Sequence, residues 1–287
     1  MGATVKVLAD LPKVGPLMAR SAVTSIGRPG ASQGLPDVSL QVASHTQDVA
    51  RLADYNRVCG FSLRDHVPAT WLHVLTFPLQ VALMSERSFP FSLAGLVHVS
   101  NRMTLHRPVT VDEKLRVTVW AENLQPHKRG VTFDMCGRVD VGGDTVWTGV
   151  SNYLASGQKI AGDPPPTQRL KQPEAEPSQL WRLPANLGRQ YAAVSGDVNP
   201  IHLNPVTARL FGFPRPIIHG MWTHARALAA FGGSLPDAYD VHVSFTKPIL
   251  LPGKARFATD GQRFAVLNSD ASKPYLVGEV ASAGSRS

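Results

Sequence analysis

Asp197 and His202 are the two side chains whose types and spacing best suit acid and base chemistry. They lie five residues apart in the stretch Ser195-Gly-Asp-Val-Asn-Pro-Ile-His202. A carboxylate and an imidazole that reach one water molecule can exchange protons with it, because histidine titrates near neutral pH. Five residues of an ideal helix would aim them about 140° apart. Because Asn199-Pro200 breaks a helix, we predict a bent segment in which the two side chains converge.

A long apolar helix is predicted directly after this segment, from Pro216 to Phe231, where apolar residues recur at helical spacing. Pro216 suits a first-turn position. Gly220 then falls in the first turns, near the positive end of the helix dipole, and its lack of a side chain permits close approach to its N–H. We therefore expect the Gly220 N–H to stabilise negative charge that develops on a substrate oxygen.

The sequence also contains an internal repeat. Tyr55–Phe61 aligns with Tyr191–Asp197 without a gap, and Leu105–Arg116 aligns with Phe245–Arg256 in the same order. Ordered matches of this kind indicate a duplicated unit. Each half is predicted to hold one helix followed by antiparallel strands, an α+β arrangement, and the two halves are predicted to form a pseudo-dimer with their sheets paired edge to edge. The first half supplies a predicted helix at Pro68–Ser85, strands at Leu115–Ala121 and Val131–Val139 and a hairpin at Gly142-Gly143, and the second half supplies strands at Val241–Phe245 and Phe264–Leu267.

The two halves are predicted to differ in function. In the ungapped alignment Phe61 stands opposite Asp197 and His66 stands opposite His202, while the helices align Leu72 or Val74 with Gly220. The first half, residues 1–160, is therefore predicted to be non-catalytic. A proline-rich linker is predicted at 161–186 and the catalytic half at 187–287. The Gly, Ser and Pro content of the first roughly 40 residues suggests partial disorder.

Composition narrows the range of partners. Lys and Arg number 29 against 21 Asp and Glu, which gives a net charge of +8 and favours anionic partners such as coenzyme A or an acidic carrier protein. No basic tract or nucleic-acid-binding motif is present, so nucleic acid is not expected. Two distant cysteines suggest neither a disulfide nor a metal site. Without an apolar run of membrane-spanning length or a signal peptide, we expect a cytoplasmic protein.

Two motifs resemble those of the MaoC-like, (R)-specific enoyl-thioester hydratases. They are Ser195-Gly196-Asp197-x-Asn199-Pro200-x-His202 and Arg215-Pro216-x-x-His219-Gly220-Met221, and Asn204 departs from the aspartate that relatives often have. The resemblance implies a tandem (double) hot-dog fold and the reversible hydration of trans-2-enoyl thioesters to (3R)-hydroxyacyl thioesters in fatty-acid metabolism. It implies Asp197 and His202 as the acid and base and the Gly220 amide as the oxyanion donor. Ser195, Asn199, His219 and Met221 would contact the substrate, although a direct part for His219 stays open.

The resemblance implies no cofactor beyond the coenzyme A or acyl carrier protein that carries the acyl group. Three alternatives remain at this stage. Hot-dog folds also serve acyl-thioester hydrolases, and the chain could be a non-catalytic acyl-binding subunit. The Ser-Gly-Asp-x-Asn-Pro stretch could also be only a turn followed by a helix cap. Acyl chain length, the carrier, the physiological direction and a homodimer of such chains are left open by the sequence.

Overall fold

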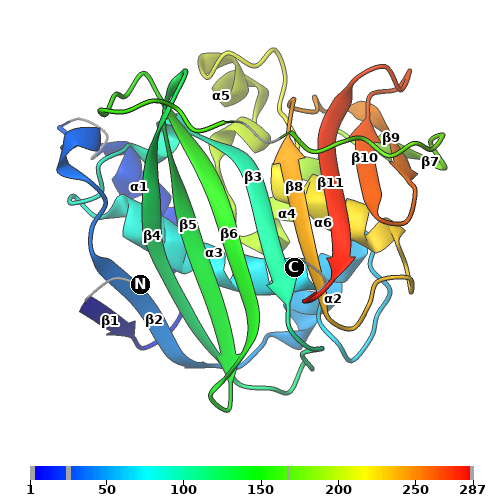
Figure 1. Ribbon diagram of the computed structural model, residues 1–287, viewed down its shortest axis with the longest axis horizontal. Coiled ribbons are helices and arrows are strands. Elements are labelled where there is room, and N and C mark those ends of the chain that lie inside the picture. The colour runs from blue at the N-terminus through cyan, green and yellow to red at the C-terminus, as the bar shows by residue number, and fades with distance from the viewer. Residues whose placement is uncertain (1–3, 24–26, 167–168, 285–287) are drawn as a thin grey trace. The chain divides into compact units, whose positions relative to one another are not determined.

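The structure is a computed structural model that describes residues 4–23, 27–166 and 169–284 (Figure 1). Its packing divides the chain into two units, neither of which is continuous in sequence. Unit 1 comprises residues 1–47, 72–103 and 112–168, and unit 2 comprises residues 48–71, 104–111 and 169–287. This division differs from the predicted boundaries after 160 and 186, because residues 48–71 of the first half pack with the second.

Unit 1 is a sheet with one long helix, as the sequence predicted. The strand order is β1-β2-β4-β5-β6-β3, with β1 parallel to β2 and the β2–β4, β4–β5 and β5–β6 pairs antiparallel. Thr76 of the helix α3 lies so close to the sheet that a Cβ on Gly137 would stand 3.0 Å from its methyl group. The elements are β1 (Thr4–Leu8), α1 (Val14–Val23), η1 (Ala31–Gln33), β2 (Val38–His45), α3 (Ala69–Ser85), η2 (Leu93–Gly95), β3 (Leu96–Leu105), β4 (Leu115–His127), β5 (Gly130–Val141) and β6 (Asp144–Ser156).

The predicted helix and strands of the first half are confirmed, with small changes at their ends. Gly142 and Gly143 turn the chain between β5 and β6 with positive φ angles of 60° and 105°. The described part of the first 40 residues contains regular structure, because β1 pairs with β2 and α1 is helical, and partial disorder of the stretch stays a prediction. Residues 1–3 and 24–26 of that stretch lie outside the described residues.

Unit 2 repeats the plan with a second sheet and the helix α6. The strand order is β8-β11-β10-β9-β7, and every neighbouring pair is antiparallel. Phe231, which follows α6, packs edge-on against Phe257 and Phe264 of the sheet. The elements are α2 (Val49–Cys59), β7 (Gln179–Leu183), α4 (Leu187–Ser195), η3 (Pro200–His202), α5 (Pro205–Leu210), α6 (Gly220–Ala230), β8 (Tyr239–Phe245), β9 (Gly253–Thr259), β10 (Arg263–Leu267) and β11 (Pro274–Ser282).

Two boundaries predicted from the sequence differ from those in the structure of this unit. The predicted linker at 161–186 contains β7, which completes the sheet by pairing with β9. The helix predicted from Pro216 begins at Gly220, because the backbone before it is extended: the Ile218 N–H donates to the Ile249 carbonyl and Ile217 bridges Leu250. Gly220 is therefore the first residue of α6 rather than part of its second turn.

The helices α2 and α4 pack against each other within unit 2. The Arg51 Nε donates to the Val194 carbonyl at 2.8 Å, and the rings of Tyr55 and Tyr191 lie 6.2 Å apart. Both tyrosines are almost completely buried. Burial of this apolar and aromatic surface explains why residues 48–71 belong to unit 2. Within the described residues, no helix is long and apolar enough to cross a membrane.

We expect acid to destabilise unit 1 through the buried His73 and the half-buried His98. The rings of His73 and His98 lie 6.5 Å apart, and burial lowers the pKa of His73 to about 4 and that of His98 to about 3. A histidine of the unfolded chain titrates near 6.5, so below that pH the unfolded state binds more protons and folding weakens. Each histidine should remove about 1.4 kcal/mol of unfolding free energy per pH unit between 6.5 and its lowered pKa.

The measurement is urea unfolding between pH 7 and pH 5. His73→Leu should reduce the dependence of the unfolding free energy on pH, whatever it does to stability at pH 7. His106→Gln, which changes an exposed histidine, should leave that dependence as it is. An equal pH dependence in wild type and His73→Leu would contradict the prediction.

Candidate active site

Asp197 stands on a turn that the sequence builds directly after α4. Gly196 ends the helix in the left-handed conformation, with φ 80°, and its N–H donates to the Ala192 carbonyl. The Ser195 hydroxyl accepts the Asp197 N–H at 3.1 Å, and the Asp197 carboxylate accepts the Asn199 N–H at 3.2 Å. A glycine is needed here because a side chain would strain the positive φ. The turn fixes the carboxylate with its side chain 25% exposed.

His202 is held by the short helix η3 and by a hydrogen bond from its ring. The Asn199 side chain caps η3 by accepting the Ile201 N–H, and Pro200 occupies its first turn. The His202 Nδ1 lies 2.8 Å from the Ile217 carbonyl, which can only accept, so Nδ1 carries the proton. Nε2 is then left with a lone pair. The predicted bend after Asp197 is confirmed, and it places an imidazole ready to accept a proton.

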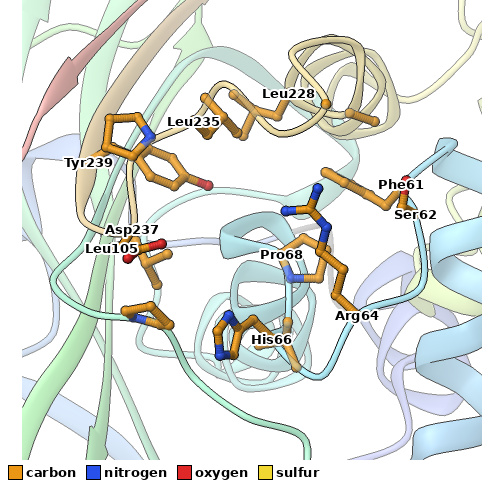
Figure 2. A pocket seen from close by; sticks show the side chains of 15 residues that line it. Phe61, Ser62, Arg64, His66, Pro68, Leu105, Leu228, Leu235, Asp237 and Tyr239 are labelled. Carbon is orange, nitrogen blue, oxygen red and sulfur yellow. The ribbon is translucent and has the colours of Figure 1, made fainter.

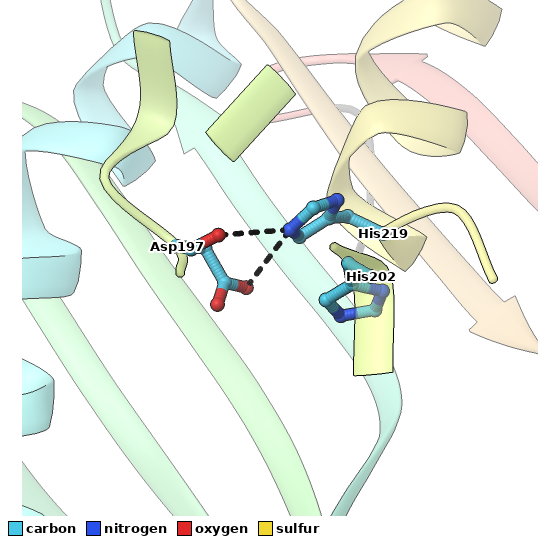
Figure 3. A group of neighbouring side chains, drawn as sticks. All are labelled: Asp197, His202 and His219. Atoms are coloured by element: carbon cyan, nitrogen blue, oxygen red, sulfur yellow. Dashed lines mark hydrogen bonds and ion pairs between the residues drawn. The ribbon is translucent and has the colours of Figure 1, made fainter. Parts of the chain in front are cut away.

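His219 completes the cluster, as Figure 3 shows. Its Nε2 lies 3.0 Å from the Asp197 carbonyl oxygen and 3.9 Å from a carboxylate oxygen. Its ring stacks on that of His202 with 3.6 Å between centroids. Because the carbonyl can only accept, His219 donates from Nε2, and Nδ1 is buried without a hydrogen-bond partner among the described residues. The sequence left a direct part for His219 open, and the structure gives it a positioning contact with the backbone of Asp197.

Burial shifts the pKa of each of the three titrating groups in this cluster toward the neutral form. Desolvation raises the pKa of Asp197, while the nearby His202 and the Asn199 N–H act in the opposite direction. Desolvation lowers the pKa of His202, with Asp197 opposing it. The pKa of His219 lies well below its ordinary value, through burial and through His202. The site therefore favours neutral histidines beside a carboxyl group that holds its proton more firmly than an exposed aspartate.

Gly220 lies next to this cluster as the first residue of α6, with His219 as the N-cap. The first N–H groups of a helix have no partner within the helix and carry its positive dipole end. A Cβ added to Gly220 would stand 3.0 Å from the Phe245 ring. Glycine is thus required for close packing as well as for access to its N–H. Met221, the next residue, is buried.

The other predicted substrate contacts have structural partners. Ser195 is buried, and its hydroxyl holds the turn of Asp197. The Asn199 side-chain oxygen caps η3. These contacts agree with the turn-and-cap interpretation of the two residues. Contact of Ser195, Asn199 and Met221 with substrate stays a prediction.

The cluster also has the composition of a metal site. Asp197, His202 and His219 each offer a ligand atom, and these atoms lie within 4.8 Å of one another. Two imidazoles and a carboxylate suit several transition metals. The His219 Nε2 is already used by the Asp197 carbonyl, so a metal would have to take the buried Nδ1 instead. We favour proton transfer over metal binding for this reason.

The first half lacks this site more completely than its sequence suggested. The Val67 N–H donates to the Val109 carbonyl as Ile218 does to Ile249, and His66 bridges Thr110 as Ile217 bridges Leu250. His66 is therefore the counterpart of Ile217, and its alignment with His202 was wrong. Counting on from these pairs makes Ala69, rather than Leu72 or Val74, the counterpart of Gly220. The segment that carries His202 in the second half has no equivalent between Phe61 and Asp65.

A surface pocket of about 130 Å³ occupies this degenerate position (Figure 2). Phe61 lines it where the carboxylate would stand, and His66 is exposed at its edge. The buried Tyr239 hydroxyl accepts a hydrogen bond from the Ala69 N–H, and burial raises the pKa of Tyr239. The backbone donor that corresponds to Gly220 is therefore already occupied. Asp237 and His66 both line this pocket, but it offers no open oxyanion donor at the position that corresponds to Gly220.

The comparisons with known proteins agree with this geometry. Residues 167–271 match the model of the MaoC like domain. The 3-hydroxyacyl-thioester dehydratase X of Mycobacterium tuberculosis is 40% identical over 222 residues, which cover 77% of this chain and 79% of that protein. The chain belongs to the MaoC-like dehydratase family, whose members of this type fold as double hot dogs.

Solved structures place the fold in the same class. The crystal structure of HtdX of Mycobacterium tuberculosis superposes with a TM-score of 0.75 at 36% identity, and covers 85% of this chain and 99% of that chain. Another protein of that bacterium, described as having a double hot-dog fold, superposes with a TM-score of 0.54 over 84% of this chain and 93% of that chain. At 13% identity it shares the fold alone. The predicted α+β double hot-dog fold is confirmed, and it fits a pseudo-dimer within one chain.

We expect His66→Gln to leave catalytic turnover within a few-fold of wild type. His66 occupies the place of Ile217, and the backbone donor that corresponds to the Gly220 N–H is already bonded to Tyr239. The measurement is turnover on a 2-enoyl thioester, with His202→Gln as the matched change in the second half. A loss in folded His66→Gln as deep as that in His202→Gln would show that the first half holds a working site.

Proposed function

We propose that this protein catalyses the reversible hydration of trans-2-enoyl thioesters to (3R)-hydroxyacyl thioesters in fatty-acid metabolism. The observation that carries the proposal is the pairing of Asp197 with a His202 whose Nδ1 proton is fixed on the Ile217 carbonyl. The similarity to the dehydratase of Mycobacterium tuberculosis supports the same reaction. The enzyme is then a hydro-lyase whose substrate is carried by coenzyme A or by an acyl carrier protein.

His202 acts as the base in the hydration direction. Its pKa is lowered by burial, so the ring is neutral near pH 7 and the Nε2 lone pair can take a proton from water. The water oxygen bonds to C3, and the electron pair of the C2–C3 double bond moves toward the thioester carbonyl. Negative charge then develops on that carbonyl oxygen, where the Gly220 N–H and the helix dipole stabilise it.

Asp197 donates a proton to C2, and the proton that His202 took from water then passes to Asp197, so both groups regain their starting states. Burial raises the pKa of its carboxyl group, so a larger fraction of it carries the proton that a general acid needs than in an exposed aspartate. In the reverse direction the same groups exchange roles, with Asp197 removing the C2 proton and His202 protonating the leaving hydroxyl. We include the (3R) configuration of the product in the proposal because the family motif implies it.

His219 is a positioning residue in this scheme. Its hydrogen bond to the Asp197 carbonyl and its stacking on His202 fix the two catalytic side chains relative to each other. The proposal includes a cytoplasmic location, for which the two free, buried cysteines give support.

We expect Asp197→Asn and His202→Gln each to lower turnover a hundredfold or more, the usual size of effect for a general acid or base. The measurement follows loss of the conjugated absorbance of a 2-enoyl-coenzyme A, with the product identified by mass. A product heavier by one water supports hydration, whereas release of free thiol identifies a thioesterase.

Two outcomes would contradict the assignment of Asp197 and His202 as acid and base. One is near wild-type turnover in either folded variant. The other is a loss of activity on treatment with a chelator that zinc restores, because that would make Asp197, His202 and His219 metal ligands.

We expect Gly220→Val to depress turnover a hundredfold or more, with a smaller effect on the Michaelis constant, because one oxyanion donor is typically worth that much. Added methyl groups would stand between the N–H and the substrate oxygen. The same methyl groups would press on Phe245, which lies 3.0 Å from the position of the first Cβ. Melting temperature and turnover are therefore measured on each variant.

The double variant Gly220→Val with Phe245→Leu separates the two effects. Relief of the contact with Phe245 should restore melting temperature without restoring turnover. Recovery of both together would assign Gly220 to packing alone and remove it from the catalytic set.

A further inference from the structure

The short helix α5 presents large apolar side chains to solvent. Val206 and Leu210 are 65% and 79% exposed and lie one helical turn apart, and the adjoining Phe211 is 48% exposed. The opposite side of the helix packs inward through the fully buried Ala208. We call Val206, Leu210 and Phe211 the α5 patch. An apolar patch of this kind on a polar surface is typical of an interaction site.

The stretch of sequence that contains the α5 patch is basic. From residue 187 to residue 236 the sequence contains four arginines and one acidic residue, Asp197 of the candidate site. Three of these arginines are exposed, namely Arg189, Arg209 and Arg215. An apolar centre with basic residues around it favours a partner that combines apolar and acidic side chains.

The patch is tied to the segment that carries His202. The Thr207 hydroxyl of α5 donates to the carbonyl of Pro200, the first residue of η3, at 2.7 Å, and Arg189 donates to the Leu203 carbonyl at 3.2 Å. The Ile217 N–H donates to the Ile201 carbonyl at 3.2 Å and closes the loop. A partner bound to α5 would therefore contact the same segment that positions the base.

The first half shows that the fold does not require this segment. Its chain passes from Phe61 to Asp65 without an equivalent of η3 or α5, yet it makes the same backbone bridges before its helix. His202 explains the presence of η3. Nothing in the packing of the hot-dog half explains why α5 should expose Leu210.

We propose that the α5 patch docks an acidic acyl carrier protein, which presents the enoyl group on its phosphopantetheine arm. This inference rests on the proposed function and names its carrier. Coenzyme A carries phosphates, but it lacks the combination of apolar and acidic side chains that a carrier protein can set against the patch. A second copy of this chain is disfavoured, because a two-fold contact would bring the same arginines together.

The test compares one enoyl group on two carriers. Leu210→Ser and Arg209→Glu are assayed with an enoyl-charged acidic bacterial acyl carrier protein and with the matching enoyl-coenzyme A. Each variant should lower kcat/KM for the carrier-bound substrate tenfold or more, mainly through KM, and should change kcat/KM for the coenzyme A substrate less than twofold. Leu180→Ser and Arg182→Glu on β7 are the controls, since both change exposed residues outside the patch.

A binding measurement keeps this inference separate from the proposed function. Calorimetry with the carrier protein bearing a free phosphopantetheine arm should show binding that Leu210→Ser weakens tenfold, even if neither thioester is hydrated. In that case the proposed function fails and the docking surface stands. Equal losses on both substrates, or carrier binding that is absent or unchanged in Leu210→Ser, would overturn the inference.

Two further outcomes would assign the patch to another occupant and also overturn it. One is a change in the sedimentation of the chain alone in Leu210→Ser, which would make the patch a contact between copies. The other is binding to anionic phospholipid vesicles that Leu210→Ser abolishes while kinetics on the carrier-bound substrate are unchanged. Circular dichroism and melting temperature show that each variant remains folded.

Discussion

The hydrogen bond from His202 Nδ1 to the Ile217 carbonyl is the contact on which the candidate site depends. It ties the turn after α4 to the extended residues before α6, two segments that approach the site from different directions. It also decides which ring nitrogen carries the proton, and so which nitrogen can act as a base. The extended conformation of Ile217 and Ile218 in turn places the first N–H groups of α6 beside the histidines. One contact thus sets the tautomer and relates the proposed base to the proposed oxyanion donor.

The chemistry-bearing residues could be predicted from the sequence because they lie in two compact motifs. Ser, Gly, Asp, Asn and Pro have strong local preferences, so the bend between Asp197 and His202 follows from residue types alone. The role of His219 could not be predicted in this way. Its contact with the Asp197 carbonyl joins residues that are 22 positions apart, and only the folded chain brings them together.

Errors in the sequence analysis arose where the tertiary structure decides. The start of α6 was placed at Pro216 because proline suits a first turn, but pairing with residues 249–251 keeps that stretch extended. His66 was aligned with His202 because an ungapped alignment cannot account for the segment that the first half lacks. The division at residue 160 followed proline content, whereas packing of α2 on α4 sets the unit boundary. The signal for α5 was present in Asn204-Pro205, a cap followed by proline, but its exposed face shows only in the structure.

Because unit 2 is discontinuous in sequence, the chain cannot be divided at its repeat boundary without separating residues that pack together. Tyr55 and Arg51, encoded in the first half of the gene, cover Tyr191 and the Val194 carbonyl directly before the catalytic turn. A gene fragment that encodes only residues 187–287 would leave this surface bare, so the catalytic half is not a transferable module. The ancestral boundary survives in the repeat, while recombination at that boundary would separate residues that now fold together.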